Sequence, residues 1–266
     1  MEDQAEVGTQ PISLTVRAGV ATITIDRPAK KNAITAAMWS ALIDAVAQVD
    51  AMADARLLVL RGAGADFSAG ADIAEFETVR RDAETARSYE ALNARAFAAF
   101  RNAQVPTLAV IRGACLGGGF GLAISCDLRL AAPDARFSIP AAKLGLAYPA
   151  DGIRHIVWAA GPQLARYLVH SGQQISAAQA LDTGLLLEII EDEALDTRVE
   201  ALAASIAATA PLTNRATKQA INALLSDNPA MMREAERLGD MTFDSEDYAE
   251  GRRAFREKRK PVFTGR

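Results

Sequence analysis

The stretch from Gln104 to Ala131, QVPTLAVIRGACLGGGFGLAISCDLRLA, decides how the rest of the chain is interpreted. Residues 108–111 form a continuous apolar run, LAVI, which is typical of a strand buried on both faces. The three glycines at 117–119 remove every Cβ at one point, and the nearly uncharged segment 120–126 predicts a core helix. Residues 127–132 predict a return to extended structure. The stretch therefore predicts a strand, a glycine turn, a helix and a second strand in close succession.

The glycine turn has two interpretations. Bare residues at a helix N-terminus leave unpaired N–H groups that a partial negative charge can approach closely. An enzyme can use such groups to stabilise an oxyanion. The glycines can equally serve only to pack the helix tightly on a neighbouring strand. This stretch on its own leaves both interpretations open.

Composition limits the class of protein. A chain of 266 residues fits one large domain, or a domain with an appendage, and can bury a full core. It is 50% hydrophobic and 23% charged, which is ordinary for a globular protein and argues against disorder. The net charge of −4 disfavours a broad basic surface, so we expect no nucleic-acid partner.

The compartment follows from three further features. No apolar run reaches the ~18 residues of a membrane span, so we expect no membrane association. Residues 1–10 are acidic and polar, unlike a secretory signal, and predict a loose tail. Cys115 and Cys126 sit in apolar surroundings and are interpreted as buried free thiols of a reducing compartment. Together these features predict a cytoplasmic protein.

The order of the predicted elements indicates an α/β fold. Residues 13–17 and 20–25 alternate around a turn and predict a β-hairpin, and residues 57–60 predict another buried strand. Thr35 is the expected N-cap of the first helix. Strands alternate with helices until about residue 190, and only helices follow. We expect a parallel core with right-handed crossovers over residues 1–195 and a helical region over residues 196–266.

Several chemistries lack their motifs. There is no GxxxxGK[ST] loop, and the glycine run does not have the spacing of a dinucleotide fingerprint. No GxSxG elbow occurs. His155 and His170 fall on different predicted helical segments without matching ligands, so we expect no metal site.

Four segments carry a family resemblance: DRPAKKNAI (26–34), DFSAGADI (66–73), GACLGGGF (113–120) and FREKRKPVF (255–263). In this order they resemble the motifs of the crotonase superfamily, the enoyl-CoA hydratase/isomerase family, and the similarity covers nearly the whole chain. The resemblance implies the crotonase-like (ClpP/crotonase) fold, a spiral of ββα units followed by a C-terminal helical trimerisation region. It also implies a homotrimer or a dimer of trimers.

The resemblance implies chemistry on an acyl-CoA thioester, whose carbonyl oxygen gains negative charge as the group becomes enolate-like. The expected catalytic donors are the backbone N–H groups of Ala71 and Gly118. Losing one such donor typically costs ~3–4 kcal/mol of barrier. No tightly bound cofactor is implied, because coenzyme A enters as part of the substrate.

The resemblance also assigns residues that hold the coenzyme A nucleotide: Arg27, Lys30, Ala69, Asp72 and Ile73. In relatives the tail can close over the nucleotide, sometimes from a neighbouring subunit, which here gives that role to Lys260 and Phe263. The cations at 258–260 fit equally well as residues favoured at a helix C-terminus.

The chain departs from the family at two positions. Hydratases of the family use two glutamates, and Gly121 and Ala141 stand in their places. Neither side chain can transfer a proton, and each properly placed acid or base contributes roughly 10²–10⁴-fold. We therefore expect only a trace of ordinary hydration and favour a proton shift such as double-bond isomerisation.

Asp151 is the candidate catalytic base, since it is the only carboxylate in the loop after the second missing glutamate. It can instead cap the next helix at Gly152. Tyr148 and His155 are further candidates. Two other functions remain open: another reaction of the family, such as thioester hydrolysis or C–C cleavage, and a non-catalytic subunit that binds acyl-CoA.

Overall fold

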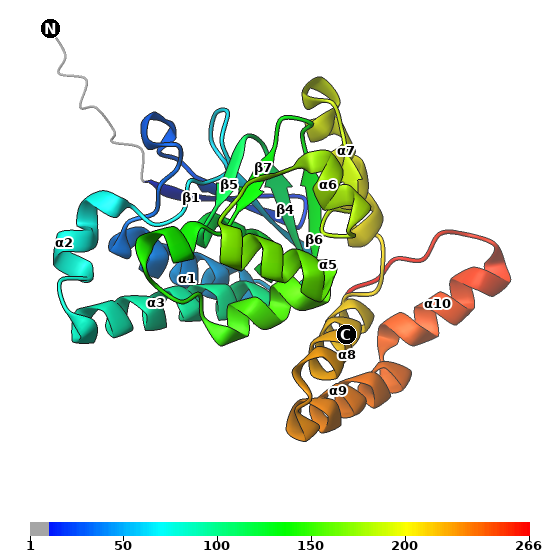
Figure 1. Cartoon of the computed structure of the whole chain (residues 1–266). Coiled ribbons are helices and arrows are strands. Elements are labelled where there is room, and N and C mark those ends of the chain that lie inside the picture. Colours follow the sequence, from blue (N-terminus) through cyan, green and yellow to red (C-terminus); the bar gives the residue numbers. More distant parts are fainter. Residues whose placement is uncertain (1–10) are drawn as a thin grey trace, which may run out of the picture.

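The computed structural model describes residues 11–266, and the predicted tail at residues 1–10 lies outside the described part. Six strands form the main sheet in the order β1–β2–β3–β4–β6–β9 (Figure 1). These strands are β1 (Ile12–Arg17), β2 (Val20–Ile25), β3 (Leu57–Gly62), β4 (Thr107–Ile111), β6 (Leu128–Ala131) and β9 (Glu188–Ile189). The predicted hairpin is confirmed, because β1 pairs antiparallel with β2, and every other pair in this sheet is parallel.

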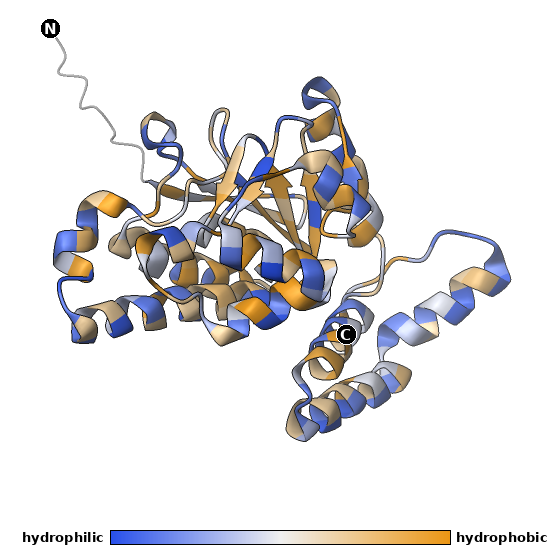
Figure 2. Cartoon of the chain, viewed as in Figure 1, coloured by the Kyte–Doolittle hydropathy of each residue, from blue (hydrophilic) through white to orange (hydrophobic). Residues whose placement is uncertain are grey.

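The central strands are buried on both faces, as their apolar runs predicted. In β3, Leu58 and Leu60 join the core cluster that includes residues of helices α1 (Ala36–Asp50), α3 (Ala83–Asn102) and α4 (Gly118–Ser125), whereas Leu57 and Val59 join a second cluster. Helix α7 (Asp192–Ala207) covers that second face through Leu195 and its neighbours. Figure 2 shows mostly hydrophobic strands and, around them, helices of mixed hydropathy.

The helices of the core are α1 (Ala36–Asp50), α2 (Phe76–Val79), α3 (Ala83–Asn102), α4 (Gly118–Ser125), α5 (Ala150–Ser171) and α6 (Ala177–Asp182). Thr35 caps α1 as predicted, because its side chain accepts a hydrogen bond from Met38 N–H. Short 3₁₀ turns are η1 (Pro28–Lys30), η2 (Ile73–Glu75), η3 (Pro140–Leu144) and η4 (Thr242–Asp244).

A small second sheet lies beside the glycine turn. It consists of β5 (Ala114–Leu116), β7 (Arg136–Ser138) and β8 (Ile175–Ser176), in that order. β5 leads directly into α4, and Cys115 on β5 also bridges to Ser68. This sheet therefore brings the segment around Ser68 next to the start of α4.

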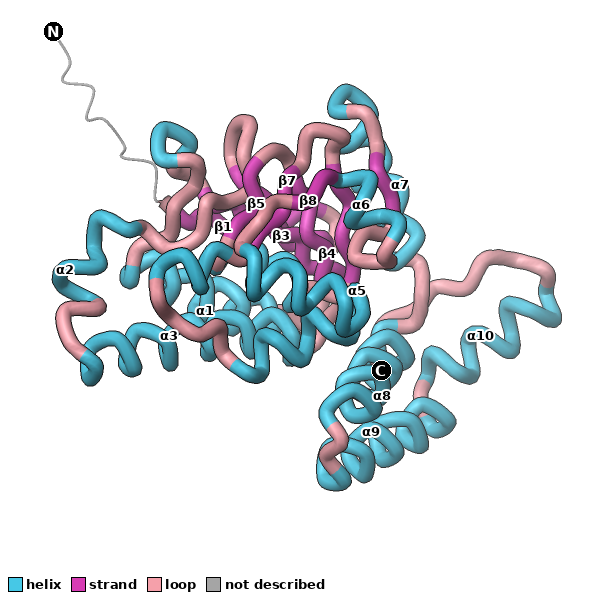
Figure 3. Tube along the Cα trace, viewed as in Figure 1, coloured by secondary structure: helices cyan, strands magenta, loops and turns pink. Residues whose placement is uncertain are grey.

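The C-terminal helices α8 (Pro211–Ser226), α9 (Pro229–Met241) and α10 (Glu246–Glu257) extend away from the sheet (Figures 1 and 3). The division expected between residues 195 and 196 falls inside α7. Because Leu195 and Ala203 of α7 both pack on the main sheet, α7 belongs to the core layer, and the projecting helical part begins after it.

Both thiols are buried and free, as expected. Burial raises the pKa of Cys126 to about 12, so this thiol stays protonated and is not a nucleophile. Within residues 11–266, no helix combines the length and the apolar character needed to cross a membrane.

The C-terminal tail is held against α10 by a buried carboxylate. Glu250 accepts hydrogen bonds from the Arg259 side chain and from the Val262 N–H, the latter at 3.0 Å. The hydrogen bond from Arg259, followed by that from Val262, lowers the pKa of Glu250 from 4.5 to about 2. A depressed folded pKa means that this contribution to tail docking is complete above about pH 4.5 and is lost as the pH falls toward 2.

We therefore expect the amide NMR signal of Val262 to stay unchanged as the pH is lowered through 4.5, and to move only as it approaches 2. Glu250→Gln should remove this titration because the variant has no carboxylate to protonate. A midpoint near 4.5 in the unmodified protein would contradict the proposed anchoring.

Candidate active site

A cavity of about 100 Å³ lies between helix α3, the start of α4 and the loop that precedes α5. Small or apolar residues make up most of its wall: Ala69, Ala71, Ile73, Phe76, Phe97, Gly117, Gly118, Ile139, Pro140, Ala141, Leu144, Leu146 and Pro149. The remaining wall residues are polar or charged: Arg80, Glu90, Asn93 and Tyr148. The predicted donors Ala71 and Gly118 thus border one cavity.

The first turn holds Ala71 by pairing its neighbours. Ile34 N–H donates to the Gly70 carbonyl at 2.8 Å, and Asp72 N–H donates to the Ile34 carbonyl at 2.9 Å. The Ala71 N–H between them has no acceptor among the described residues. Gly70 has φ +94°, and a Cβ there would lie 2.7 Å from the Leu116 carbonyl oxygen, so the turn requires glycine.

The second turn places Gly118 at the first position of α4, where a helix has no acceptor of its own for the N–H. No other acceptor for it occurs within residues 11–266. A Cβ on residue 118 would lie 3.6 Å from Ala71 N and 2.9 Å from Trp39 Cζ2. The two turns therefore lie against each other, and Trp39 leaves room only for glycine.

Two residues that the sequence did not indicate as functional hold these turns in place. The buried Asn32 side chain donates to the carbonyls of Ala63 and Asp66, at 2.9 and 2.6 Å. Ser68 donates to the Asn32 carbonyl at 2.8 Å and accepts from Gly70 N–H at 3.1 Å. Both residues lie inside segments 26–34 and 66–73, so the motifs contained the signal, but their partners depend on tertiary structure.

The two positions that lack a carboxylate are close to the cavity. Ala141 lines it. A Cβ on Gly121 would lie 2.5 Å from Phe97 Cζ and 2.7 Å from Tyr148 Oη. A glutamate at 121 would therefore not fit unless Phe97 and Tyr148 moved.

Asp151 lies outside the cavity. Helix α5 begins at Ala150, one residue before Asp151, with Pro149 at the N-cap position, so the expectation that Asp151 caps the helix is wrong. Its carboxylate accepts from Arg101 Nη2 at 2.6 Å, and its side chain is 56% exposed. This placement gives no support to its expected role as the base.

The two weaker candidates have different positions. Tyr148 lines the cavity, and burial raises the pKa of its phenol well above its ordinary value, so the group stays protonated. His155 packs edge-to-face on Trp158 and lies 3.7 Å from Asp151 Oδ1, on the same side of α5 as that carboxylate. Burial lowers the pKa of His155 to about 4, so it is neutral near pH 7.

Helix α3 supplies polar wall residues that the sequence pattern did not indicate. Glu90, Asn93 and Phe97 recur at i, i+3 and i+7, which places them on one helix face. Arg80 follows the last residue of α2. Its Nη2 lies 2.5 Å from Glu90 Oε1, and its guanidinium stacks on the Phe76 ring. Within residues 11–266, Glu90 is the only carboxylate that lines the cavity.

The expected coenzyme A residues lie together at the first turn. Arg27 donates to the Asp72 carboxylate at 2.6 Å, which lowers the pKa of Asp72 below its ordinary value. Lys30 is exposed in η1, and Ile73 is exposed at the rim of the cavity. Ala69 N–H is used within the fold, since it donates to the Lys31 carbonyl at 2.8 Å.

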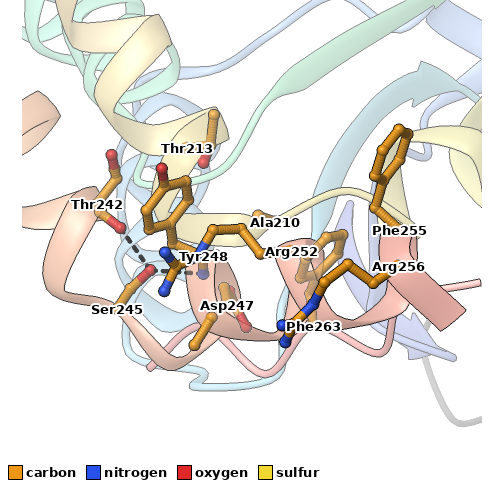
Figure 4. A pocket seen from close by; sticks show the side chains of 12 residues that line it. Ala210, Thr213, Thr242, Ser245, Asp247, Tyr248, Arg252, Phe255, Arg256 and Phe263 are labelled. Carbon is orange, nitrogen blue, oxygen red and sulfur yellow. Dashed lines mark hydrogen bonds between the residues drawn. The ribbon is translucent and has the colours of Figure 1, made fainter.

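Lys260 and Phe263 do not line this cavity. Phe263 lies in a separate hollow of about 720 Å³ between α10, the tail and the start of α8, and Lys260 is exposed in the tail. Figure 4 shows this hollow, with Phe255 and Phe263 near Arg256 and with Tyr248 beside Ser245. Among residues 11–266 no group of three potential metal ligands occurs.

The α/β spiral core, the projecting C-terminal helices and the opposed glycine turns define a protein of the crotonase fold. A crystal structure of an enoyl-CoA hydratase/carnithine racemase from Magnetospirillum magneticum matches this chain with a TM-score of 0.90 and 37% identity, over 97% of both chains.

The profile of the family Enoyl-CoA hydratase/isomerase matches residues 15–266. A crotonyl-CoA hydratase of Syntrophomonas wolfei is 33% identical over 247 residues, 92% of this chain and 94% of that protein. A short-chain-enoyl-CoA hydratase of Clostridium acetobutylicum is 31% identical over 244 residues, 91% of this chain and 92% of that protein. The chain belongs to the enoyl-CoA hydratase/isomerase family and is an acyl-CoA enzyme of that family.

Proposed function

We propose that the chain binds a short acyl-CoA, polarises its thioester through the N–H groups of Ala71 and Gly118, and shifts a double bond rather than adding water. The observation that carries this proposal is the pair of unpartnered N–H groups at the wall of one small cavity. Donors held rigidly in such a site stabilise the negative charge that develops on the carbonyl oxygen as the enolate forms.

Hydration needs one group to deprotonate water and another to protonate Cα. Gly121 and Ala141 supply neither, and Phe97 and Tyr148 occupy the space next to Gly121. An isomerisation needs only one base, which takes a proton from one carbon and returns it two carbons away. Glu90 is the carboxylate of the cavity, so we assign proton transfer to Glu90 in place of Asp151.

Coenzyme A is proposed to lie over the surface formed by Arg27, Lys30, Ala69, Asp72 and Ile73. The exposed Lys30 would lie near its phosphates. The tail residues Lys260 and Phe263 would reach a nucleotide only from a neighbouring subunit. Large apolar side chains exposed on the C-terminal part fit self-association: Leu224, Met241, Phe243, Phe255 and Val262. We propose a homotrimer or a dimer of trimers built on these helices.

The test is a product analysis with 3-enoyl- and 2-enoyl-CoA substrates of four to six carbons, beside a crotonyl-CoA hydration assay. We expect double-bond migration, and hydration at only a trace of the rate of an established hydratase. Glu90→Gln should lower isomerisation by roughly 10²–10⁴-fold, whereas Asp151→Asn should leave it nearly unchanged.

Robust hydration would contradict the proposal, as would release of free coenzyme A or cleavage of a C–C bond. Tight binding of the thioesters without any turnover would favour a binding subunit. Equal activity of Glu90→Gln and the unmodified enzyme would remove Glu90 from the proposed mechanism.

A further inference from the structure

Of the four buried polar atoms on cavity residues that have no hydrogen-bond partner among the described residues, Glu90 Oε1 is held by its ion pair with Arg80, which leaves three. They are Arg80 Nε, Asn93 Oδ1 and Tyr148 Oη. A buried polar group without a partner costs about as much as a lost hydrogen bond, so native proteins usually satisfy it with protein, water or ligand. Three such atoms around one cavity indicate a ligand that supplies what they lack.

The chemistry of the three atoms restricts that ligand. Arg80 Nε–H can only donate, the Asn93 oxygen can only accept, and the Tyr148 hydroxyl can do both. A ligand group that meets them must therefore both donate and accept. An alkyl chain would leave all three unpaired, and a carboxylate could not satisfy the asparagine oxygen.

The charges of the cavity wall also favour a neutral ligand group. In the described part of the chain, Arg80 and Glu90 are the only charged residues that line the cavity, and Arg80 Nη2 lies 2.5 Å from Glu90 Oε1 in an ion pair. The wall is therefore neutral overall, and a ligand with a formal charge would have no counter-ion there. Asn93 is 5% exposed, so it is a built part of the wall and not a surface residue that happens to be nearby.

The position of Tyr148 places the polar group along the acyl chain. Its hydroxyl lies beside Gly121, which is three residues along α4 from Gly118. Three residues of helix rise about 4.5 Å. A thioester oxygen bound at Gly118 keeps Cα and Cβ close to that residue, so a group that reaches Tyr148 sits on Cγ or further.

We propose that the natural acyl group is short and carries a hydroxyl on Cγ or beyond, which Tyr148 and Asn93 bind together with Arg80 Nε. This inference rests on the proposed acyl-CoA function and names its substrate class. The hydroxyl donates to Asn93 Oδ1 and accepts with its two lone pairs from both Tyr148 O–H and Arg80 Nε–H, so the three unpaired atoms are satisfied.

The experiment measures binding of saturated thioesters, which lack the double bond and are not turned over in the proposed reaction. The ligands are butyryl-CoA, 3-hydroxybutyryl-CoA, 4-hydroxybutyryl-CoA and succinyl-CoA, measured by isothermal titration calorimetry. We expect 4-hydroxybutyryl-CoA to bind at least about tenfold more tightly than butyryl-CoA. Tyr148→Phe and Asn93→Leu should each reduce that preference severalfold, whereas the control Tyr167→Phe, an exposed tyrosine on α5, should not.

Each other outcome overturns the inference in a recognisable way. Equal affinity for butyryl- and 4-hydroxybutyryl-CoA would mean that the polar atoms do not select a hydroxyl. A preference for succinyl-CoA would indicate an anionic acyl group, and one confined to 3-hydroxybutyryl-CoA would place the hydroxyl next to the thioester. A preference that survives both variants would remove these residues from the site. If no CoA thioester binds, the proposed function itself fails.

Discussion

Replacing Ala71 by proline should lower kcat by about 10²–10³-fold, because proline removes one of the two N–H donors proposed for the thioester oxygen. The substitution removes no hydrogen bond of the fold, since the Ala71 N–H has no acceptor among the described residues. Ala71 lies in a parallel β-bridge with Ile34 and is not among the residues with positive φ, so proline meets no left-handed backbone there. Gly70 precedes it at φ +94°, outside the α region that a following proline disfavours.

The matched control is Ala71→Gly, which changes the side chain but keeps the donor. It should retain most of the activity and lose at most about 1 kcal/mol of stability through backbone freedom. The measurements are steady-state kinetics on the best enoyl-CoA substrate and thermal unfolding of both variants. If the proline variant folds normally and keeps full activity, the carbonyl oxygen does not use this donor.

The parts of the fold that could be predicted are those that local sequence determines. Residues 57–60 and 108–111 are apolar at every position, and a strand of that kind has to be covered on both faces. The glycines at 70 and 118 were recognisable because they stand in the quoted motifs. The contacts that exclude larger residues there, with Leu116 and Trp39, join segments that are distant in the chain and appear only in the structure.

Asp151 shows what sequence spacing cannot reveal. Its distance from the missing glutamate suggested a base, but its direction is set by Arg101, which is 50 residues away in the chain. Because α5 starts at Ala150, Asp151 lies in the first turn of this helix. Its side chain points toward Arg101 of α3 and not into the cavity. An ion pair between two helices that are distant in sequence leaves no local pattern.

Glu90 and Asn93 show a related limit. The amphipathic pattern of residues 83–102 predicts one apolar face with Tyr89, Leu92, Ala96 and Phe100 on it; Leu92 is half-buried and the other three are buried. A helix of 20 residues that borders a cavity has a second inward face, displaced by one position. Polar residues are tolerated on that face because a ligand or water can form hydrogen bonds with them. Their hydropathy is the same as that of solvent-exposed residues, so hydropathy alone cannot distinguish the two.

Replacing Lys218 by methionine should destabilise the protein by about 1–3 kcal/mol, because it leaves two backbone carbonyls and the partly exposed Asp127 carboxylate without their common donor. Lys218 lies on α8 with a side chain only 4% exposed, and its ammonium is 2.9 Å from Asp127 Oδ2. It also donates to the carbonyls of Phe100 and Val105, at 3.3 and 3.0 Å, and so ties α8 to the end of α3 and to the entry of β4. Methionine preserves the length of the side chain and supplies none of these interactions.

The measurement is the free energy of unfolding in urea, with Arg215→Met as the control. Arg215 is an exposed cation on the same helix, so its replacement should change stability by no more than about 0.5 kcal/mol. The double variant Lys218→Met with Asp127→Asn tests the cause. If the unpaired charge dominates, the double variant should be less destabilised than the sum of the two single changes. If the two single changes in the free energy of unfolding simply add, the lost stability comes from the carbonyls of Phe100 and Val105. These carbonyls lack their donor in both variants that carry methionine.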